Sequence, residues 1–268
     1  MKKLLLFIIT ILLPMTVKAD KSGKCGANLT WTYIEATKTL TVSGEGNMNS
    51  SNFALWGDIS GDIENVIIEE GVTSIGNNAF RGCKNIKTLL LGNSITLIGD
   101  KAFTGCSSLS SVIIPNSVTT IDIWAFSNCS SLKTLSIGNG VTSIGRGAFK
   151  GCTDLETLEI GDCNTSIGIE AFGECSSLTA LVIPDKVISI GDIAFQGCNS
   201  LTSVTIGNGV ESIGYSAFDG CPNITNLSMG KGVKTIGEKA FYNCDKIPSV
   251  IIPNSTISIG NSAFYSCI

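Results

Sequence analysis

The apolar residues of this chain recur with a fixed period of 23 residues. Phenylalanine returns at this spacing from Phe80 to Phe264, and cysteine does so from Cys83 to Cys267. Each of these phenylalanines follows an alanine, and an isoleucine lies five residues before it. Because no insertion interrupts the series, every unit places the same side chain at the same place in space. A short, uninterrupted repeat of this kind predicts a solenoid of stacked coils.

The order of residues within a unit predicts its elements. In the fourth unit, apolar Leu135 and Ile137 alternate with polar residues, which predicts a strand over 134–137. A second extended piece is expected over 141–144, where β-branched residues are frequent. A glycine then lets the chain turn, and we expect a helical or 3₁₀ turn over 148–152. Stacking these units predicts a parallel sheet with strands about 4.8 Å apart.

The complete motif of the fourth unit reads Leu132-x-x-Leu135-x-Ile137, then Ile144-Gly145, Ala148-Phe149 and Cys152. It resembles the BspA-like leucine-rich repeat, and the resemblance covers 63–268 in nine copies. The resemblance implies an α/β fold class: a right-handed leucine-rich-repeat solenoid with a parallel β-sheet on one face and short helical or 3₁₀ turns on the other. The stretch from Cys25 to Gly44 also resembles the β-rich N-terminal cap of that family.

The first nineteen residues have the pattern of a secretory signal peptide. Lys2 and Lys3 precede an apolar run, and Ala19 ends a stretch with small residues at the cleavage positions. A membrane anchor, the alternative, needs about 20 continuous apolar residues, and Thr10 and Pro14 interrupt this run. An exported chain would be secreted or held at the cell surface. We therefore expect a signal peptide over 1–19, an N-terminal β cap over 20–62 and nine 23-residue repeats over 63–268.

Composition narrows the chemistry that the chain can perform. Its 268 residues include no histidine, which excludes a Ser-His-Asp or Cys-His nucleophile pair and a histidine-ligated metal. The formal net charge is −4, and it would be −7 without residues 1–19, which hold three lysines and no acids. Such an acidic chain is a poor partner for nucleic acid or an anionic membrane. We expect no enzymatic activity, no cofactor and no metal site.

The cysteine column has two interpretations. In an exported protein, a cysteine framework indicates disulfides, and neighbouring coils about 4.8 Å apart are close enough for a bridge. However, the side chains of a stacked column run parallel, and a buried free cysteine behaves as a small apolar residue. We therefore interpret the column as reduced core thiols. Cys25 and Cys163 lie outside it, and Cys163, which stands where the preceding unit has Gly140, is a candidate exposed thiol or a local substitution.

A slower repeat is superimposed on the fast one. Pro115, Pro184 and Pro253 are 69 residues apart, which is three units each time. This spacing indicates growth by copying blocks of three units.

The middle residue of each strand motif should face outward on the sheet. That column reads Ile67, Leu90, Ile113, Ser136, Glu159, Val182, Thr205, Ser228 and Ile251. Its first three members predict an apolar patch near the N-terminal end, and such a patch usually marks a contact surface. The alternatives are β-propensity alone, or cover by the cap or by another copy of the chain. The candidate protein-binding residues are Ile67, Leu90, Ile113, Val182 and Ile251.

A second candidate is the pair Ile123 and Trp124, where most units have polar or small residues. Tryptophan is enriched at binding hot spots. Covering of a neighbouring coil by the Trp124 ring is the alternative.

Two functions from different classes follow. The resemblance implies a non-enzymatic secreted or cell-surface protein-binding module, since members of that family bind host extracellular proteins such as fibronectin and fibrinogen. The alternative is a structural protein that dimerises or stacks. Phe264, Cys267 and Ile268 follow the pattern without a polar terminal unit, and such a unit is normally required to cap a solenoid. Possible partners are therefore a host extracellular-matrix protein or a second copy of the chain.

Overall fold

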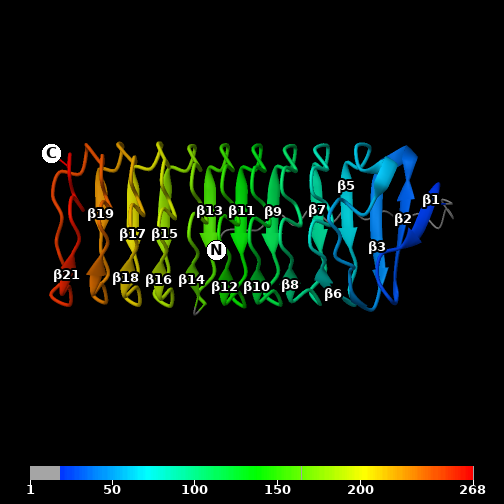
Figure 1. Cartoon of the computed structure of the whole chain (residues 1–268), viewed down its shortest axis with the longest axis horizontal. Helices are drawn as coiled ribbons and strands as arrows, with labels where there is room; N and C mark the ends of the chain where they lie inside the picture. Colours follow the sequence, from blue (N-terminus) through cyan, green and yellow to red (C-terminus); the bar gives the residue numbers. More distant parts are fainter. Residues whose placement is uncertain (1–18, 164, 268) are drawn as a thin grey trace, which may run out of the picture.

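The computed structural model describes residues 19–163 and 165–267. Apart from Ala19, the expected signal peptide over 1–19 lies outside the described residues. The described chain forms a solenoid whose coils follow one another along the long axis (Figure 1). The expected leucine-rich-repeat solenoid with parallel strands is confirmed.

Most coils contribute a long strand and a short strand, on two different sides, whereas the last described coil contributes only a short strand. The long strands are β5 (Asn65–Ile68), β7 (Thr88–Leu91), β9 (Ser111–Ile114), β11 (Thr134–Ile137), β13 (Thr157–Ile160), β15 (Ala180–Ile183), β17 (Ser203–Ile206) and β19 (Asn226–Ser228). The short strands are β4 (Gly46–Asn47), β6 (Val72–Ile75), β8 (Leu97–Ile98), β10 (Thr120–Ile121), β12 (Ser143–Ile144), β14 (Ser166–Ile167), β16 (Ser189–Ile190), β18 (Ser212–Ile213), β20 (Thr235–Ile236) and β21 (Ser258–Ile259).

Equivalent residues of successive coils pair in parallel, as a repeat without insertions requires. Leu135 of β11, for example, is in register with Leu158 of β13. The short strands form one continuous ten-stranded sheet from β4 to β21. The long strands instead form three separate sheets, with the orders β1-β2-β3-β5-β7, β9-β11-β13 and β15-β17-β19.

The N-terminal strands extend the first of these sheets. Strand β2 (Leu29–Ile34) pairs antiparallel with both β1 (Lys21–Lys24) and β3 (Thr39–Gly44). Strand β3 then pairs in parallel with β5. The edge of the first coil is thereby covered by paired backbone.

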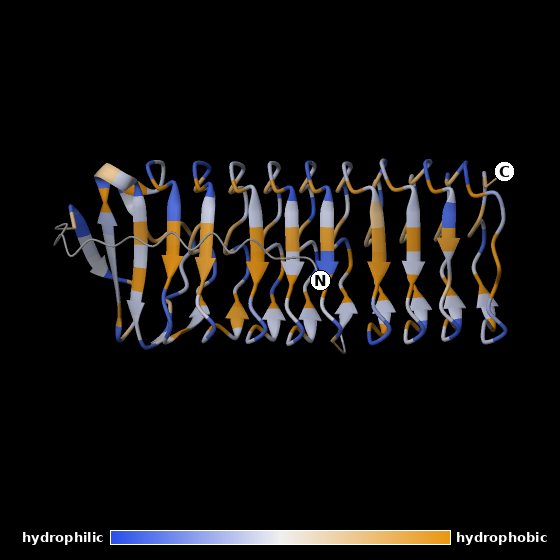
Figure 2. Cartoon of the chain, turned by 180° about the vertical axis from the view of Figure 1, so that it is seen from behind, coloured by the Kyte–Doolittle hydropathy of each residue, from blue (hydrophilic) through white to orange (hydrophobic). Residues whose placement is uncertain are grey.

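The core is a set of stacked columns. The rings from Phe80 to Phe264 lie 4.9–5.3 Å apart, with their planes within 9° of parallel. Trp56, which precedes the repeats, begins this stack 4.9 Å from Phe80. Figure 2 shows apolar residues recurring at the same level from coil to coil. Because each ring contacts only its two neighbours in the stack, stability is shared between adjacent coils.

The third side of each coil differs from the expected helical or 3₁₀ turn. Among the described residues there is no α-helix, and the two 3₁₀ helices, η1 (Glu35–Thr37) and η2 (Gly57–Ile59), precede the repeats. In the fourth coil the N–H of Ala148 donates to Gly145 at 3.2 Å, whereas the next N–H, of Phe149, donates to Ala171 of the following coil at 2.8 Å. Alternate donors therefore join neighbouring coils, which a helix could not do.

The second extended piece is also shorter than expected. Strand β12 covers only Ser143–Ile144 of the expected 141–144. The N–H of Val141 donates back to the carbonyl of Gly138 at 3.4 Å, so the chain is still turning at that position.

Candidate functional site

The candidate apolar patch lies on the outer face of β5, β7 and β9. Ile67 and Leu90 are in register on neighbouring strands. Leu90 is 63% exposed and Ile113 is 70% exposed, whereas Ile67 is half-buried. Leu90 and Ile113 therefore face outward and are exposed, as expected. Ile67 is only partly exposed, because it lies beside the neighbouring strand β3.

Two hollows indent this patch, and Leu90 lines both. One, of about 480 Å³, lies between β5 and β7 and is lined by Ile67, Leu90 and Glu70 among others. The other, of about 330 Å³, lies between β7 and β9 and includes Ile113 and Pro115 in its lining. An apolar surface with hollows of this size can receive aliphatic or aromatic side chains of a partner.

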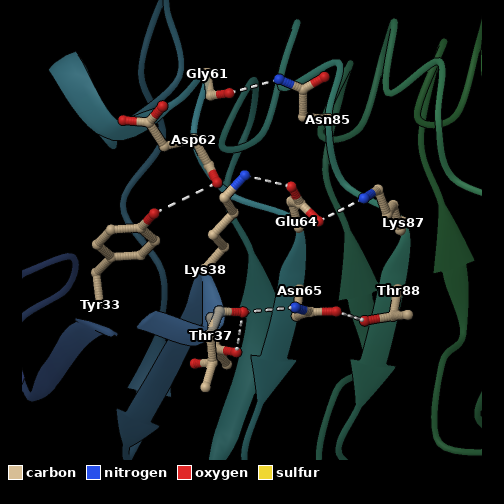
Figure 3. Close-up of polar contacts among 11 residues, drawn as sticks. Tyr33, Thr37, Lys38, Gly61, Asp62, Glu64, Asn65, Asn85, Lys87 and Thr88 are labelled. Carbon is tan, nitrogen blue, oxygen red and sulfur yellow. Dashed lines mark hydrogen bonds and ion pairs between the residues drawn. The ribbon is translucent and has the colours of Figure 1, made fainter. Parts of the chain in front are cut away.

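Charged and amide groups border the patch where these strands begin. Figure 3 shows the Glu64 carboxylate between the ammonium groups of Lys38, at 2.6 Å, and Lys87. The hydrogen bond from Lys38, followed by that from Lys87, lowers the pKa of Glu64. Beside them, the amide of Asn65 donates to the carbonyl of Thr37 and accepts from the hydroxyl of Thr88. These groups form a polar rim whose hydrogen bonds lie within the chain.

A second polar group borders the other end of the strands. The Glu70 carboxylate accepts hydrogen bonds from the backbone N–H and side-chain amide of Asn93 and from the hydroxyl of Ser94. The backbone donor of Asn93 is the main cause of the lowered pKa of Glu70. A patch enclosed by polar rims has the anatomy of a protein-interaction surface.

The remaining outward candidates do not join this patch. Val182 and Ile251 are exposed, but Ser136 and Glu159 stand in the column between Ile113 and Val182. Thr205 and Ser228 likewise follow Val182 in register. The structure therefore brings Ile67, Leu90 and Ile113 together and leaves Val182 and Ile251 as separate apolar residues.

Ile123 and Trp124 lie on the turn side, away from the long-strand sheet. Ile123 is exposed, whereas Trp124 is half-buried. The Trp124 ring lies over Gly147 of the next coil so closely that a Cβ on that glycine would overlap the ring. The Lys150 ammonium is 6.0 Å from the ring centroid. The Trp124 ring therefore covers the neighbouring coil, which is the alternative to a binding hot spot.

An ion cluster adjoins this tryptophan. The side chain of Glu170 is only 11% exposed and contacts Arg146 at 2.9 Å and Lys150 at 3.1 Å. Burial alone would raise the pKa of Glu170, but the hydrogen bonds from the two cations hold it below its ordinary value. The cluster is satisfied internally.

The cysteines are unsuited to nucleophilic chemistry. All eleven lie among the described residues, where they are free thiols, and ten of them are buried. Burial raises the pKa of Cys83 and Cys152 to about 12, which suppresses the reactive thiolate. Cys163 is also buried, at 4% exposure, which excludes the exposed thiol and leaves a local substitution, the other interpretation of this residue. Its Sγ donates to the carbonyl of Gly161.

The described part of the chain has neither a cluster of metal ligands nor a membrane-spanning helix. Residues 19–163 and 165–267 hold no group of three or more potential His, Cys, Asp or Glu ligands. Over the same ranges, no helix has the length and apolar character needed to cross a bilayer.

The polar rims are the part of the site that sequence reasoning missed. A signal for them exists, because Glu64 and Lys87 are opposite charges 23 residues apart and therefore neighbours in one column. Lys133 and Glu156 repeat this relation and pair at 3.7 Å.

Comparison with known proteins agrees with the repeat. A family model described as the BspA type leucine rich repeat region matches residues 58–179 and 165–268. The crystal structure of the T. pallidum leucine-rich repeat protein TpLRR is similar, with 24% identity, 82% of this chain and 87% of that chain covered, and a TM-score of 0.52. A leucine-rich repeat protein from Bacteroides ovatus is also similar, with 20% identity and a TM-score of 0.52. The match covers 90% of this chain and 91% of that chain. No curated protein matches the chain significantly. At these identities, the likeness to solved structures concerns the fold.

Proposed function

Because the chain belongs to the family with the BspA-type leucine-rich repeat region, we propose that it is a non-enzymatic protein-binding module, exported by a signal peptide over 1–19 and acting as a secreted or cell-surface protein. The proposal includes the division into a β cap over 20–62 and nine repeats over 63–268. A repeat solenoid offers an extended surface of regularly spaced side chains, which suits it to binding proteins.

One observation carries the proposal: Leu90 and Ile113 are large apolar side chains exposed side by side between polar rims. A soluble surface rarely keeps such residues together without a partner. Leu90 lines two hollows and therefore stands at the centre of the proposed contact. Ile67 lies next to Leu90, on the side nearer β3, and lines one of these hollows. Val182, Ile251, Ile123 and Trp124 are proposed as outlying contacts.

The partner is proposed to be a host extracellular-matrix protein, which makes the chain an adhesin. The net charge of −4 disfavours nucleic acid as the partner. An apolar patch with satisfied polar rims suits a folded protein surface that supplies aliphatic or aromatic anchors.

A binding measurement with matched variants tests the proposal. Immobilised fibronectin and fibrinogen serve as probes for the purified chain, Leu90→Glu and Thr205→Glu. Thr205 occupies the same outward position on β17 and is exposed, so the second variant carries the same new charge outside the patch. We expect binding by the parent and by Thr205→Glu, and a loss of about thirtyfold for Leu90→Glu, the size of a hot spot.

Two results would overturn parts of this proposal. A parent chain that binds neither probe removes the matrix assignment. Equal weakening by the two glutamates removes the patch as the contact. Trp124→Ala, measured in parallel, is expected to weaken binding less than Leu90→Glu, because its ring is already occupied in covering Gly147.

Self-assembly is the second candidate, favoured by exposed apolar side chains on the last described coil. Ile257 and Ile259 are exposed there, and β21 pairs with β20 on one side only. An unpaired strand edge can accept the same edge of a second copy. Light scattering over a concentration series tests this role, and a monomer throughout the series would contradict it.

A further inference from the structure

Three prolines mark the places where the long-strand sheet is interrupted. The first junction lies between β7 and β9, just before Pro115, and the second lies between β13 and β15, just before Pro184. At the third, the described residues 249–252 before Pro253 form no strand beside β19. Within the part of the chain that the structure describes, no backbone hydrogen bond joins the long strands themselves across any of these junctions. At the corner before the strands, the N–H of Ser108 still donates to Lys84, and that of Ser177 to Thr153, each at 3.1 Å.

The proline ring explains each interruption. Most other coils have glycine at this position, and that glycine lies against the preceding coil: a Cβ on Gly138 or Gly161 would be 2.7 Å from preceding backbone atoms. A proline ring cannot enter so small a space. Proline also has no N–H, so it cannot donate a bond such as that from Gly92 to the carbonyl of Ile68 in the preceding coil, at 2.8 Å. The coil that carries proline is therefore held away from its predecessor on this side.

A second ladder stops at the same junctions. At the corner after the long strands of paired coils, a side-chain oxygen of Asn or Asp, or of Glu70 in the first unit, accepts the N–H of its equivalent one coil later. Asn116 accepts from Asn139 at 2.8 Å, and Asn139 accepts from Asp162 at 3.0 Å. Among the described residues, this ladder has no rung across any of the three junctions, although the exposed side chains of Lys186 and Asp162 approach to 3.3 Å across the second.

Core residues beside the second junction are more exposed than their equivalents in a paired coil, although they remain buried. Leu158 and Ile160, which precede the second junction, are each 8% exposed, whereas Leu135 and Ile137 at equivalent positions in a paired coil are 1% and 3% exposed. At the first junction the surface is hollowed by the 330 Å³ cavity beside Pro115. A cavity of about 390 Å³ beside Pro253 is lined by the equivalent residues six units later.

The other sides of the coils remain joined. Short strands pair across every junction, as β8 with β10, β14 with β16 and β20 with β21. The phenylalanine stack is also continuous, with 4.9 Å between Phe103 and Phe126 and 5.3 Å between Phe172 and Phe195. Each junction is thus open on one side and hydrogen-bonded on the opposite side.

We propose that the three junctions are hinges and that the solenoid is a series of rigid blocks, mostly of three coils. Opening or closing the long-strand side at a junction breaks no hydrogen bond between long strands, because none joins them there. The corner bonds from Ser108 to Lys84 and from Ser177 to Thr153 stay close to the turning line. The short-strand sheet and the phenylalanine stack form the line about which each block turns. Leu90 and Ile113 lie on opposite sides of the first hinge, so its motion changes their separation. The hinge itself does not depend on the proposed function or on any partner.

Amide hydrogen exchange on the unmodified chain tests the hinges. The N–H groups of Thr88 and Gly92 donate to the preceding coil, so by alternation those of Leu89 and Leu91 point across the first junction. We expect these two amides to exchange about tenfold faster, or more, than their equivalents Val112 and Ile114, since each lacks the stabilisation of a hydrogen bond. Leu158 and Leu227 are the equivalents of Leu89 before the second and third junctions, and their amides are also expected to exchange faster than that of Val112. Uniform protection along this column would overturn the proposal.

Replacement of one proline by the residue found in paired coils tests the cause. Pro115→Gly restores both the N–H and the space that a paired coil needs. We expect the exchange of Leu89 to slow to the rate of Val112, while Leu158 at the second junction keeps its fast exchange. Pro184→Gly is the matched control, with the reverse result expected. Fast exchange at Leu89 in folded Pro115→Gly would show that proline does not hold the junction open.

Discussion

The Sγ atom of Cys106 donates a hydrogen bond of 3.3 Å to the backbone carbonyl of Phe80 in the preceding coil. The same relation repeats from Cys129 to Cys267. The carbonyl of Phe80 also accepts the N–H of Cys83, so it receives one backbone and one thiol donor. A sulfur in this position acts as a donor, which requires the protonated and reduced thiol.

Thiol titration tests the reduced state of this column. We expect all eleven cysteines to react with a disulfide reagent after denaturation without reductant. Before denaturation, the reaction should be slow and begin at Cys267, the cysteine that is not fully buried. If the denatured chain has two, four or more fewer reactive thiols than its eleven cysteines, disulfides are present, and the thiol interpretation is contradicted.

The buried thiols also predict unfolding at alkaline pH. An unfolded cysteine ionises near pH 8.5, whereas burial raises the folded pKa of Cys152 and Cys198 to about 12. Between these values only the unfolded state loses protons, so stability is complete below pH 8.5 and falls as pH rises. Each such thiol should lower the free energy of unfolding by about 1.4 kcal/mol per pH unit.

Urea denaturation with reductant at pH 7.5, 8.5 and 9.5 measures this slope. Cys129→Ala removes one thiol and should reduce the slope by about 1.4 kcal/mol per pH unit. A free energy of unfolding that stays constant over this range would contradict the prediction.

Removal of a central ring should divide the solenoid. Phe149 stacks on Phe126 at 5.3 Å and on Phe172 at 5.2 Å. Phe149→Ala should cost about 3–5 kcal/mol, and urea unfolding followed by circular dichroism should become biphasic, because coupling between neighbouring coils is lost. Phe264→Ala, at a half-buried ring, should cost less. Equal losses for the two variants would argue against coupling through the stack.

Ile193, at the turn position equivalent to Asn78, lowers the stability of the fold through its backbone conformation. Ile193 has φ of +50°, a left-handed conformation that β-branched side chains disfavour, while Asn78 occupies the equivalent position with φ of +57°. Ile193→Asn should raise the free energy of unfolding by about 1 kcal/mol. Ile169→Asn, at an exposed isoleucine outside the left-handed region, should change it by less than about 0.5 kcal/mol. Thermal denaturation compares the two, and destabilisation by Ile193→Asn would refute the strain.

The sequence predicted what depends on side-chain period. The strand over 134–137 was found as β11 with those bounds, because alternation of Leu135 and Ile137 fixes both the conformation and the buried face. The turn over 148–152 was not predictable in the same way. The left-handed position just before it is occupied by Asn78, Lys101 and Trp124 in the first three units, so no residue type marks where the turn begins.

Only part of the candidate site was likewise predictable from the sequence. Exposure of Leu90 and Ile113 followed from strand alternation, but partial burial of Ile67 depends on how β3 lies beside β5. The period of the prolines is visible in the sequence. Its effect on the sheet is not, because that effect arises from the close approach of Gly138 and its equivalents to the preceding coil.

The one-sided junctions give the molecule a direction-dependent stiffness. A rod that is interrupted on one side and continuous on the other bends most easily in the plane that contains both sides. A load that bends the molecule toward the short-strand side would therefore curve it with β7 and β9 on the convex surface. Force would spread Leu90 and Ile113 apart before it separated the short strands, so the proposed contact surface would respond to mechanical load.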